Sequence, residues 1–264
     1  LRSEVRHLGT EINLNVLKNI YEAMKGHIDY KFKCEVKDIL VEDNKVKGVI
    51  LKDDSVIECD YVALGVGRPG AQWLSSIMSK HGVDVKNNRV DIGVRVETNN
   101  IIMDDINKYL YEGKFIFNTS VGTQVRTFCS NPSGHVVIEN YDGVMVCNGH
   151  AYNDQVLGSK NTNFALLVSN KFTEPFKSSN EYGESIARLS NMLGGGVIVQ
   201  RFGDLIRGQR SNKHRIESSF LTPTLNATPG DLSLVIPKRQ LDDIIEMIYA
   251  LDKVAPGTAS DDTL

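Results

Sequence analysis

The sequence of 264 residues lacks the features that define several large classes of protein. It has one tryptophan and only four cysteines, and Cys34, Cys59, Cys129 and Cys147 form no C-x-x-C pair. This pattern predicts no metal site and no disulfide scaffold, and it favours a reducing, cytoplasmic setting. No apolar run approaches the roughly 20 residues that cross a bilayer, and no apolar segment of a signal peptide follows the first residues. We therefore expect no membrane partner.

An excess of positive charge is missing as well. The 30 lysines and arginines face 33 acidic residues, and the net charge of −3 is spread without long runs. Nucleic-acid binding needs a concentrated basic face, so we expect no nucleic-acid partner. Hydrophobic residues make up 41% of the chain, which is an ordinary globular composition. A small-molecule substrate is the expected partner, and the sequence leaves the oligomeric state open.

The first third of the chain predicts a helix followed by a β-meander. Thr10 is a suitable N-cap for a helix over 10–25, and Gly26 is well placed to end it. Alternating apolar positions separated by polar turns then predict an antiparallel meander, an apolar buried strand and an amphipathic helix. The expected strands cover 29–34, 36–41, 45–51, 55–59 and 61–64, and the helix covers 71–80.

Strand patterns dominate the remainder. Arg95 and Glu97 alternate with Val94 and Val96, so we expect them to face solvent. A boundary is expected near residues 82–88. The predicted strands here are 89–97, 125–129, 135–140, 144–148, 164–168 and 197–201; helices are predicted over 181–192 and 239–251, with irregular chain from 202 to about 233.

A glycine-rich loop joins the predicted strand 61–64 to the helix that follows it. Gly65, Gly67 and Gly70 have the G-x-G-x-x-G spacing of a dinucleotide-binding turn, in which glycines let the backbone approach a pyrophosphate. A primary Rossmann turn opens its domain and has an acidic residue about 20 positions on. Here a strand-rich segment comes first, and Asp84 lies in a poor second strand. We therefore interpret the loop as the closing loop of a nucleotide domain.

Further motifs give the chain a family resemblance. In chain order they are His7–Thr10, Val36–Ile39, Val46–Val49, Asp60–Gly67, Gly93–Glu97, Phe128–Gly134, Val146–Gly149, Asn163–Ala165, Gln200–Asp204, Pro229–Leu232 and Asp262–Leu264. In this order the chain resembles the bacterial FAD-dependent dehydrogenases labelled NAD-utilising dehydrogenases. The resemblance implies FAD as cofactor, with NAD(P) as a further candidate, and hydride transfer involving the flavin. Members also have a flavin-binding G-x-G-x-x-G and a Gly-Glu-Gly-type segment that this chain lacks, so we expect a central fragment of such an enzyme, inactive alone.

The resemblance also implies which residues approach the cofactor. The backbone of Val36 is expected near the adenine, and Gly65, Val66 and Gly67 are expected to pass close to the cofactor. Arg68 completes this loop; the family loop usually reads Ala-Thr-Gly-His, so the sequence departs from it here.

The substrate-site candidates lie on or beside predicted strands. They are Arg126, Cys129, His135, Asn148 and His150, and for each the alternative is a purely structural role. The second cysteine that the family often has two residues after Cys129 is Asn131 here, which argues against a redox dithiol. No catalytic residue is assigned.

A basic cluster near residue 200 has two interpretations. Arg201, Asp204, Arg207 and Arg210 could receive an anionic substrate or a cofactor phosphate, or they could form a surface set of salt bridges.

These features predict an α/β chain with α+β character. Residues 1–85 are expected to be the C-terminal part of an FAD-binding domain, a partial FAD/NAD(P)-binding Rossmann-like domain made of meander and closing strand. Residues 86–264 are expected to be a mostly antiparallel, β-rich inserted substrate-side domain. Two alternatives stay open. One is a self-contained NAD(P)-binding oxidoreductase domain that uses the glycine loop directly, and the other is a non-catalytic ligand-binding module.

Overall fold

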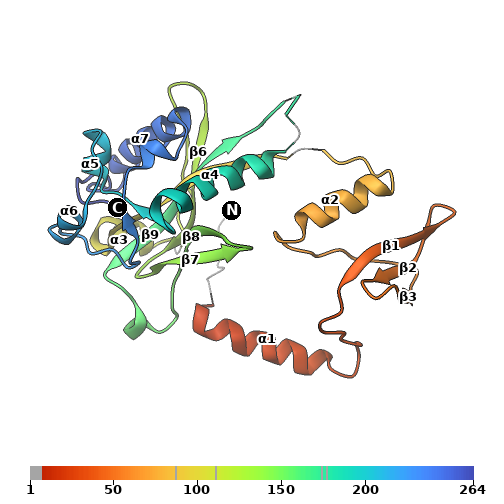
Figure 1. The fold of residues 1–264 in the computed structure, drawn as a ribbon. Coiled ribbons are helices and arrows are strands. Elements are labelled where there is room, and N and C mark those ends of the chain that lie inside the picture. Colours follow the sequence, from red (N-terminus) through yellow and green to blue (C-terminus); the bar gives the residue numbers. More distant parts are fainter. Residues whose placement is uncertain (1–7, 87, 111, 174, 177) are drawn as a thin grey trace. The chain divides into compact units, whose positions relative to one another are not determined.

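A computed structural model describes residues 8–264 except 87, 111, 174 and 177 (Figure 1). These residues fall into two compact units. The larger combines the described residues up to Val16 with those from Asn87 to Leu264, and the smaller is Leu17–Lys86. Helices and mostly antiparallel sheets are mixed, as predicted. None of the helices in the described ranges has the length and apolarity of a bilayer-spanning segment.

The larger unit is built on a four-stranded antiparallel sheet. Its order is β4 (Val90–Asn99), β9 (Asn161–Asn170), β6 (Gln124–Asn131) and β5 (Ile116–Asn118). Because side chains alternate between the two faces of a strand, the register places apolar residues of neighbouring strands on one face. Val96 is paired with Phe164, and Val125 is paired with Val168.

The hydrophobic core lies on that face of the sheet. α7 (Lys238–Asp252) packs its apolar side against β4, β6 and β9, and α3 (Asn100–Asn107) contributes Met103. Ile244 and Met247 of α7 are 1% exposed, as are Phe164 and Val168 of β9. Each such side chain contributes about 1.5–3 kcal/mol by leaving water, so this face holds the unit together.

The other face of the sheet is covered by a hairpin. β7 (His135–Tyr141) and β8 (Val144–His150) pair antiparallel, and β8 contacts β4, β6 and β9. The prediction that Arg95 and Glu97 face solvent is therefore wrong. Glu97 is 4% exposed, and a Cβ atom on Gly149 would lie 2.0 Å from Nη2 of Arg95. The alternation of residues along the strand correctly predicts that Arg95 and Glu97 lie on the face opposite Val94 and Val96, but it does not predict that a hairpin covers this face.

The segment after the sheet is more regular than the sequence indicates. α4 (Ser179–Gly194) contacts β4 and β8. β10 (Ile198–Val199) lies within the strand predicted over 197–201. Four short elements then follow where irregular chain was predicted: α5 (Phe202–Ile206), α6 (Lys213–Glu217), β11 (Thr228–Pro229), which pairs parallel with β10, and η2 (Leu232–Leu234). Another short helix, η1 (Gln155–Leu157), precedes β9. One or two turns give too little periodicity to be detected in a sequence.

The smaller unit contains the predicted meander. β1 (Val36–Glu42), β2 (Lys45–Leu51) and β3 (Val56–Glu58) form an antiparallel sheet in that order. α2 (Ala71–Lys80) is joined to β1 by a hydrogen bond of 3.2 Å from Trp73 Nε1 to the carbonyl oxygen of Lys37. α1 (Thr10–Met24) begins in the sequence of the larger unit and ends in that of the smaller.

Two predicted strands of this unit are absent from its described residues. Residues 29–34 form turns and irregular chain, and 61–64 are irregular, with Tyr61 91% exposed. Strand composition is not enough, because a strand needs a neighbour with which its backbone groups can pair. The expected Rossmann-like closing strand is thus not formed within residues 17–86.

A buried carboxylate fastens α2 to the meander. Asp38 is 6% exposed and accepts hydrogen bonds from Lys80, from His81 Nε2 at 2.9 Å and from the Ile39 N–H at 2.8 Å. Burial alone would raise the pKa of Asp38, but the hydrogen bonds from Lys80 and His81 outweigh it and lower this pKa from 3.8 to about 2.

We expect this carboxylate to make the smaller unit sensitive to acid. Because its pKa is lowered by folding, its stabilisation is complete above pH 4 and is lost as the pH falls towards 2. After allowance for solvent screening, the loss is about 1–2 kcal/mol. Denaturant unfolding of the wild type and of Asp38→Asn between pH 2 and 6 measures it. Asp38→Asn should be less stable than the wild type at pH 6 and should lose less stability on acidification. If the free energy of unfolding fell equally steeply with pH in both proteins, the assignment to Asp38 would be contradicted.

Candidate functional site

Two of the five substrate-site candidates meet at one end of the β7–β8 hairpin. His135 and His150 are register partners, and their ring centroids are 6.0 Å apart. Tyr152 completes the group, with its ring 5.7 Å from that of His135 and 5.0 Å from that of His150. All three are partly exposed. Three side chains able to carry a proton therefore share one accessible place.

The start of α1 lies against this group. Thr10 Oγ1 is 2.8 Å from His150 Nδ1, and the Thr10 N–H donates to the carbonyl oxygen of Ala151 at 3.2 Å. Glu11 Oε1 accepts the N–H groups of Asn153 at 2.8 Å and Asp154 at 3.0 Å. The expected N-cap Thr10 thus has a second contact that its sequence position does not reveal.

The environment of His150 favours the neutral imidazole. Burial lowers its pKa, His135 lowers it further, and Glu11 opposes both effects. Because Nδ1 is held by Thr10, Nε2 of His150 is the nitrogen without a hydrogen-bond partner among the described residues. A neutral imidazole with one open nitrogen can give or take a proton near neutral pH.

A partly buried cation, Arg95, lies beneath the hairpin. Arg95 donates from Nε to Asn163 Oδ1 at 2.8 Å, and from Nη2 to the same oxygen and to the carbonyl oxygen of Cys129, each at 2.6 Å. Burial lowers its pKa, but a guanidinium stays charged in proteins. The hairpin therefore packs over a fixed positive charge.

Cys129 lies at the irregular end of β6. The register with β9 shifts between Phe128 and Asn131, and Cys129 has a φ of +47°, a conformation in which residues other than glycine are strained. Its Sγ is 4.0 Å from the carbonyl oxygen of Gly149, next to His150. Cys129 thus contacts the backbone of the residue that precedes His150 in β8.

Cys147 does not supply a reactive partner to Cys129. Although the residue as a whole is exposed, desolvation of its sulfur raises its pKa to about 11, and Arg95 offsets this only in part. A thiol with such a pKa is protonated at neutral pH and is a poor nucleophile. This agrees with the sequence argument against a redox dithiol.

The other two substrate-site candidates have structural partners elsewhere in the larger unit. Arg126 forms an ion pair with Asp91 at 2.7 Å and lies over the ring of Phe128 at 5.1 Å. Asn148 donates from Nδ2 to Glu139 at 2.6 Å. The contacts given for Arg126 and Asn148 are therefore with these structural partners and not with the histidine pair.

Glu97 was not a candidate, yet it anchors a loop to the sheet. It accepts hydrogen bonds from Asn161 Nδ2 at 3.0 Å and from the N–H and hydroxyl of Thr224. The Leu264 N–H donates to its carbonyl oxygen, and its own N–H donates to that of Leu264. Glu97 therefore fixes segments that are far away in the sequence.

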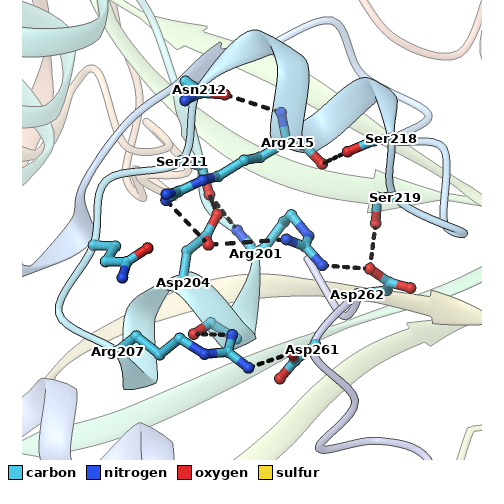
Figure 2. A network of polar contacts seen from close by, with 12 residues as sticks. Arg201, Asp204, Arg207, Ser211, Asn212, Arg215, Ser218, Ser219, Asp261 and Asp262 are labelled. Carbon is cyan, nitrogen blue, oxygen red and sulfur yellow. Dashed lines mark hydrogen bonds and ion pairs between the residues drawn. The ribbon is translucent and has the colours of Figure 1, made fainter.

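The arginine cluster is largely a network of ion pairs (Figure 2). Arg201 Nη2 lies 2.6 Å from Asp262, and Arg207 Nη2 lies 2.5 Å from Asp261. Asp204, 3% exposed, also approaches Arg201, at 3.8 Å. These contacts favour the salt-bridge interpretation for three of the four residues.

Sequence reasoning missed several members of this network. Arg215 reaches Asp204 at 3.3 Å, and Ser211, which is fully buried, donates to Asp204 at 2.7 Å (Figure 2). The two aspartates 261 and 262 come from the last residues of the chain. Two adjacent aspartates are a weak sequence signal for an ion pair, because the sequence does not indicate which arginines they contact in the fold.

The predicted cofactor residues all lie in the smaller unit. Val36 begins β1 opposite Leu51, and Gly67 has a φ of +65°, which glycine adopts without strain. A Cβ atom on Gly65 would meet no atom within 4 Å, whereas one on Gly70 would lie 2.5 Å from that of Val66. The loop is thus closely packed at its helix end and open at Gly65, a backbone surface that a cofactor can approach. Arg68 completes it just before α2.

Within the ranges that the structure describes, no group of three or more histidine, cysteine or acidic side chains is arranged to hold a metal ion.

Comparison with known protein families gives a match over the larger part of the chain. Residues 89–264 match the model of a family described as FAD-dependent protein, C-terminal domain-like. No curated protein matches the chain. The matched region starts just before β4, so it contains the sheet, the histidine pair, the partly buried Arg95 and the ion-pair network, and it covers more than half of the chain.

Proposed function

The chain belongs to the FAD-dependent protein, C-terminal domain-like family, and from this we propose that it works in an FAD-dependent oxidoreductase. The observation that carries the proposal is the match over residues 89–264. We assign residues 86–264 to the substrate-side domain, which binds a small molecule. Residues 1–85 are assigned to part of the FAD-binding domain, with hydride transfer involving the flavin and NAD(P) as a candidate second redox partner.

In this proposal FAD is held by the glycine loop. The open backbone at Gly65 and the turn at Gly67 let a cofactor come close, and the positive N-terminus of α2 follows directly. FAD, when bound, supplies the hydride chemistry, while the protein supplies orientation and electrostatics. Val36 and Arg68 are the further residues assigned to its contact surface.

We further propose that the flavin domain is completed by a segment outside residues 17–86. The apolar run 61–64 has the sequence of a buried strand, yet Tyr61 is 91% exposed and the run has no strand neighbour among the described residues. A parallel strand on one side of this run would satisfy its backbone and cover its side chains.

The histidine pair is assigned to proton transfer. Hydride transfer to or from a hydroxyl, amine or carbonyl group is accompanied by movement of a proton. We assign this proton to Nε2 of His150, because Nδ1 is held by Thr10. The partly buried charge of Arg95 lies under the same hairpin and would favour developing negative charge on a substrate.

Gly65→Val tests the cofactor site without straining the fold. The φ of Gly65 lies outside the left-handed region and a Cβ atom there has free space, so the variant should fold with an unchanged melting temperature. Its side chain would occupy the cofactor's approach, and we expect at least a tenfold loss of flavin retention. The measurement is the flavin absorbance of the purified full-length gene product, with bleaching by NADH or NADPH as a second readout.

Ser79→Ala is the matched control, because Ser79 is exposed near the other end of α2. Equal flavin content in Gly65→Val and this control would overturn the assignment of the loop. If residues 1–264 alone bound NAD(P)H, and Gly65→Val abolished that binding, the self-contained NAD(P)-binding domain would be favoured. If the full-length product held no redox cofactor, the alternative of a non-catalytic ligand-binding module would be favoured.

A further inference from the structure

A hollow in the larger unit is lined by positive charge. It has a volume of about 570 Å³ and lies where the loop before α6, the first turn of α6 and β11 meet. Arg210, Lys213 and Arg215 line it together with Asn212, Thr228 and Pro229, and none of its lining residues is acidic. The three positively charged side chains repel one another, and no acidic side chain in the lining offsets this repulsion. A bound anion that contacts all three would relieve it.

The partners of these cations leave most of their charge available. Arg210 donates only to the carbonyl oxygen of Pro229, at 3.3 Å, and no carboxylate lies within 4.0 Å of it among the described residues. Lys213 is 3.7 Å from Glu217, and both side chains are highly exposed. Such exposed pairs contribute little. Arg215 is the exception, because its Nη1 forms an ion pair with Oδ1 of Asp204 at 3.3 Å.

The walls of the hollow are fixed by polar contacts, of which the one between Ser211 and Asp204 is buried and those of Arg215 with Arg210 and Asn212 are exposed. The Ser211 N–H donates to the carbonyl oxygen of Gly230 at 3.0 Å, and its hydroxyl donates to Asp204 at 2.7 Å. Arg215 Nη1 donates to the carbonyl oxygen of Arg210 at 3.1 Å. Asn212 Oδ1 accepts the Arg215 N–H at 2.9 Å, which leaves the amide NH₂ of Asn212 as a donor (Figure 2). The site is therefore organised before any ligand arrives.

From this arrangement we propose that the hollow binds the phosphate of a small phosphorylated molecule. Three cations match a multiply charged anion better than a single carboxylate, and the guanidinium of Arg210 can donate two parallel hydrogen bonds to phosphate oxygens. The volume is within the range of sites for small organic ligands and exceeds the size of a phosphate ion, so the rest of the molecule is held there as well. Its lining residues include none of the glycine loop and neither histidine of the pair, and the proposal does not rest on the proposed redox function.

Pyrophosphate is the first probe. Isothermal titration of residues 1–264 with pyrophosphate at low salt should show saturable 1:1 binding that weakens as salt is added. Arg210→Gln and Lys213→Gln should each weaken it about tenfold, the effect of losing one charge-assisted hydrogen bond. Both residues are exposed, so melting temperatures should not change. Lys238→Gln is the control, because Lys238 is an exposed lysine of α7 outside the lining and should leave binding intact.

NADH and NADPH then identify the source of the phosphate. If the wild type bound NADPH more tightly than NADH and Arg210→Gln removed this difference, the hollow would be assigned to the 2′-phosphate of NADPH. If the wild type bound NADPH and NADH with equal affinity, the hollow would be assigned to another phosphorylated metabolite. The proposal is overturned if pyrophosphate does not saturate, or if both variants bind it as the wild type does. Flavin content of the full-length product should stay unchanged in both variants, which separates a failure here from a failure at the glycine loop.

Discussion

Gly93→Ala is expected to lower the free energy of unfolding of the larger unit by about 3 kcal/mol or more. Gly93 lies in β4 opposite Leu167 of β9, in the antiparallel pair at one edge of the four-stranded sheet. A Cβ atom at this position would lie 1.9 Å from the carbonyl oxygen of Leu166, far inside van der Waals contact. The atom in the way belongs to the backbone, so it cannot be rotated aside. The strands must separate locally, and overpacking of this kind costs about 1–3 kcal/mol or more.

Thermal unfolding followed by circular dichroism measures this effect. For a unit of this size, 3 kcal/mol corresponds to a fall in melting temperature of about 10 °C. Gly196→Ala is the control: its nearest neighbour would be Met145 Cε at 3.9 Å, and its φ is not positive. The control should melt within about 2 °C of the wild type, given the usual effect of substitutions away from such features. A Gly93→Ala protein as stable as the control would contradict the register of β4 and β9.

Asp204→Asn is expected to cost about 2–4 kcal/mol. The substitution keeps the shape of the side chain and removes the charge that Arg201 and Arg215 share (Figure 2). Asp204 is 3% exposed, so its charge is poorly screened, and removing one partner of a buried ion pair costs about 3–5 kcal/mol. Arg201 keeps Asp262 as a partner and Arg215 is partly exposed, which reduces the loss.

The second aspartate of the network is the matched control. Asp261 pairs with Arg207, and both side chains are about half exposed, so Asp261→Asn should cost less than about 1 kcal/mol. Urea unfolding of the two variants gives the difference. If both variants lose the same stability, Asp204 is not the centre of the network and the buried pair contributes no more than an exposed one.

Much of the fold follows from local patterns in the sequence. The meander of β1–β3 was predicted from apolar alternation broken by polar turns, and α7 from apolar residues at helical spacing. The hairpin of β7 and β8 was found in the same way. Such elements are predictable because their buried faces repeat every two residues or every three to four.

The candidate site could be predicted only in part. Sequence singled out His135 and His150, and the structure pairs them, but Arg126 and Asn148 are held elsewhere. Arg95 was expected on a solvated face, because alternation shows on which side of a strand a residue lies but not what covers that side. Thr10 was expected only as a helix cap, and its contact with His150 joins residues 140 positions apart.

The sequence by itself determined the class of the protein. Its glycine loop, its meander and its ordered motifs indicated a flavoprotein of α/β and α+β type, and the family match over residues 89–264 supports FAD dependence. Only the tertiary structure decided the environments of charges. It buried Glu97 and partly buried Arg95, divided the arginines between ion pairs and an open hollow, and left the predicted strand at 61–64 unpaired. The reason is physical: backbone periodicity is local, whereas burial, pairing and pKa depend on neighbours that chain folding brings from far along the sequence.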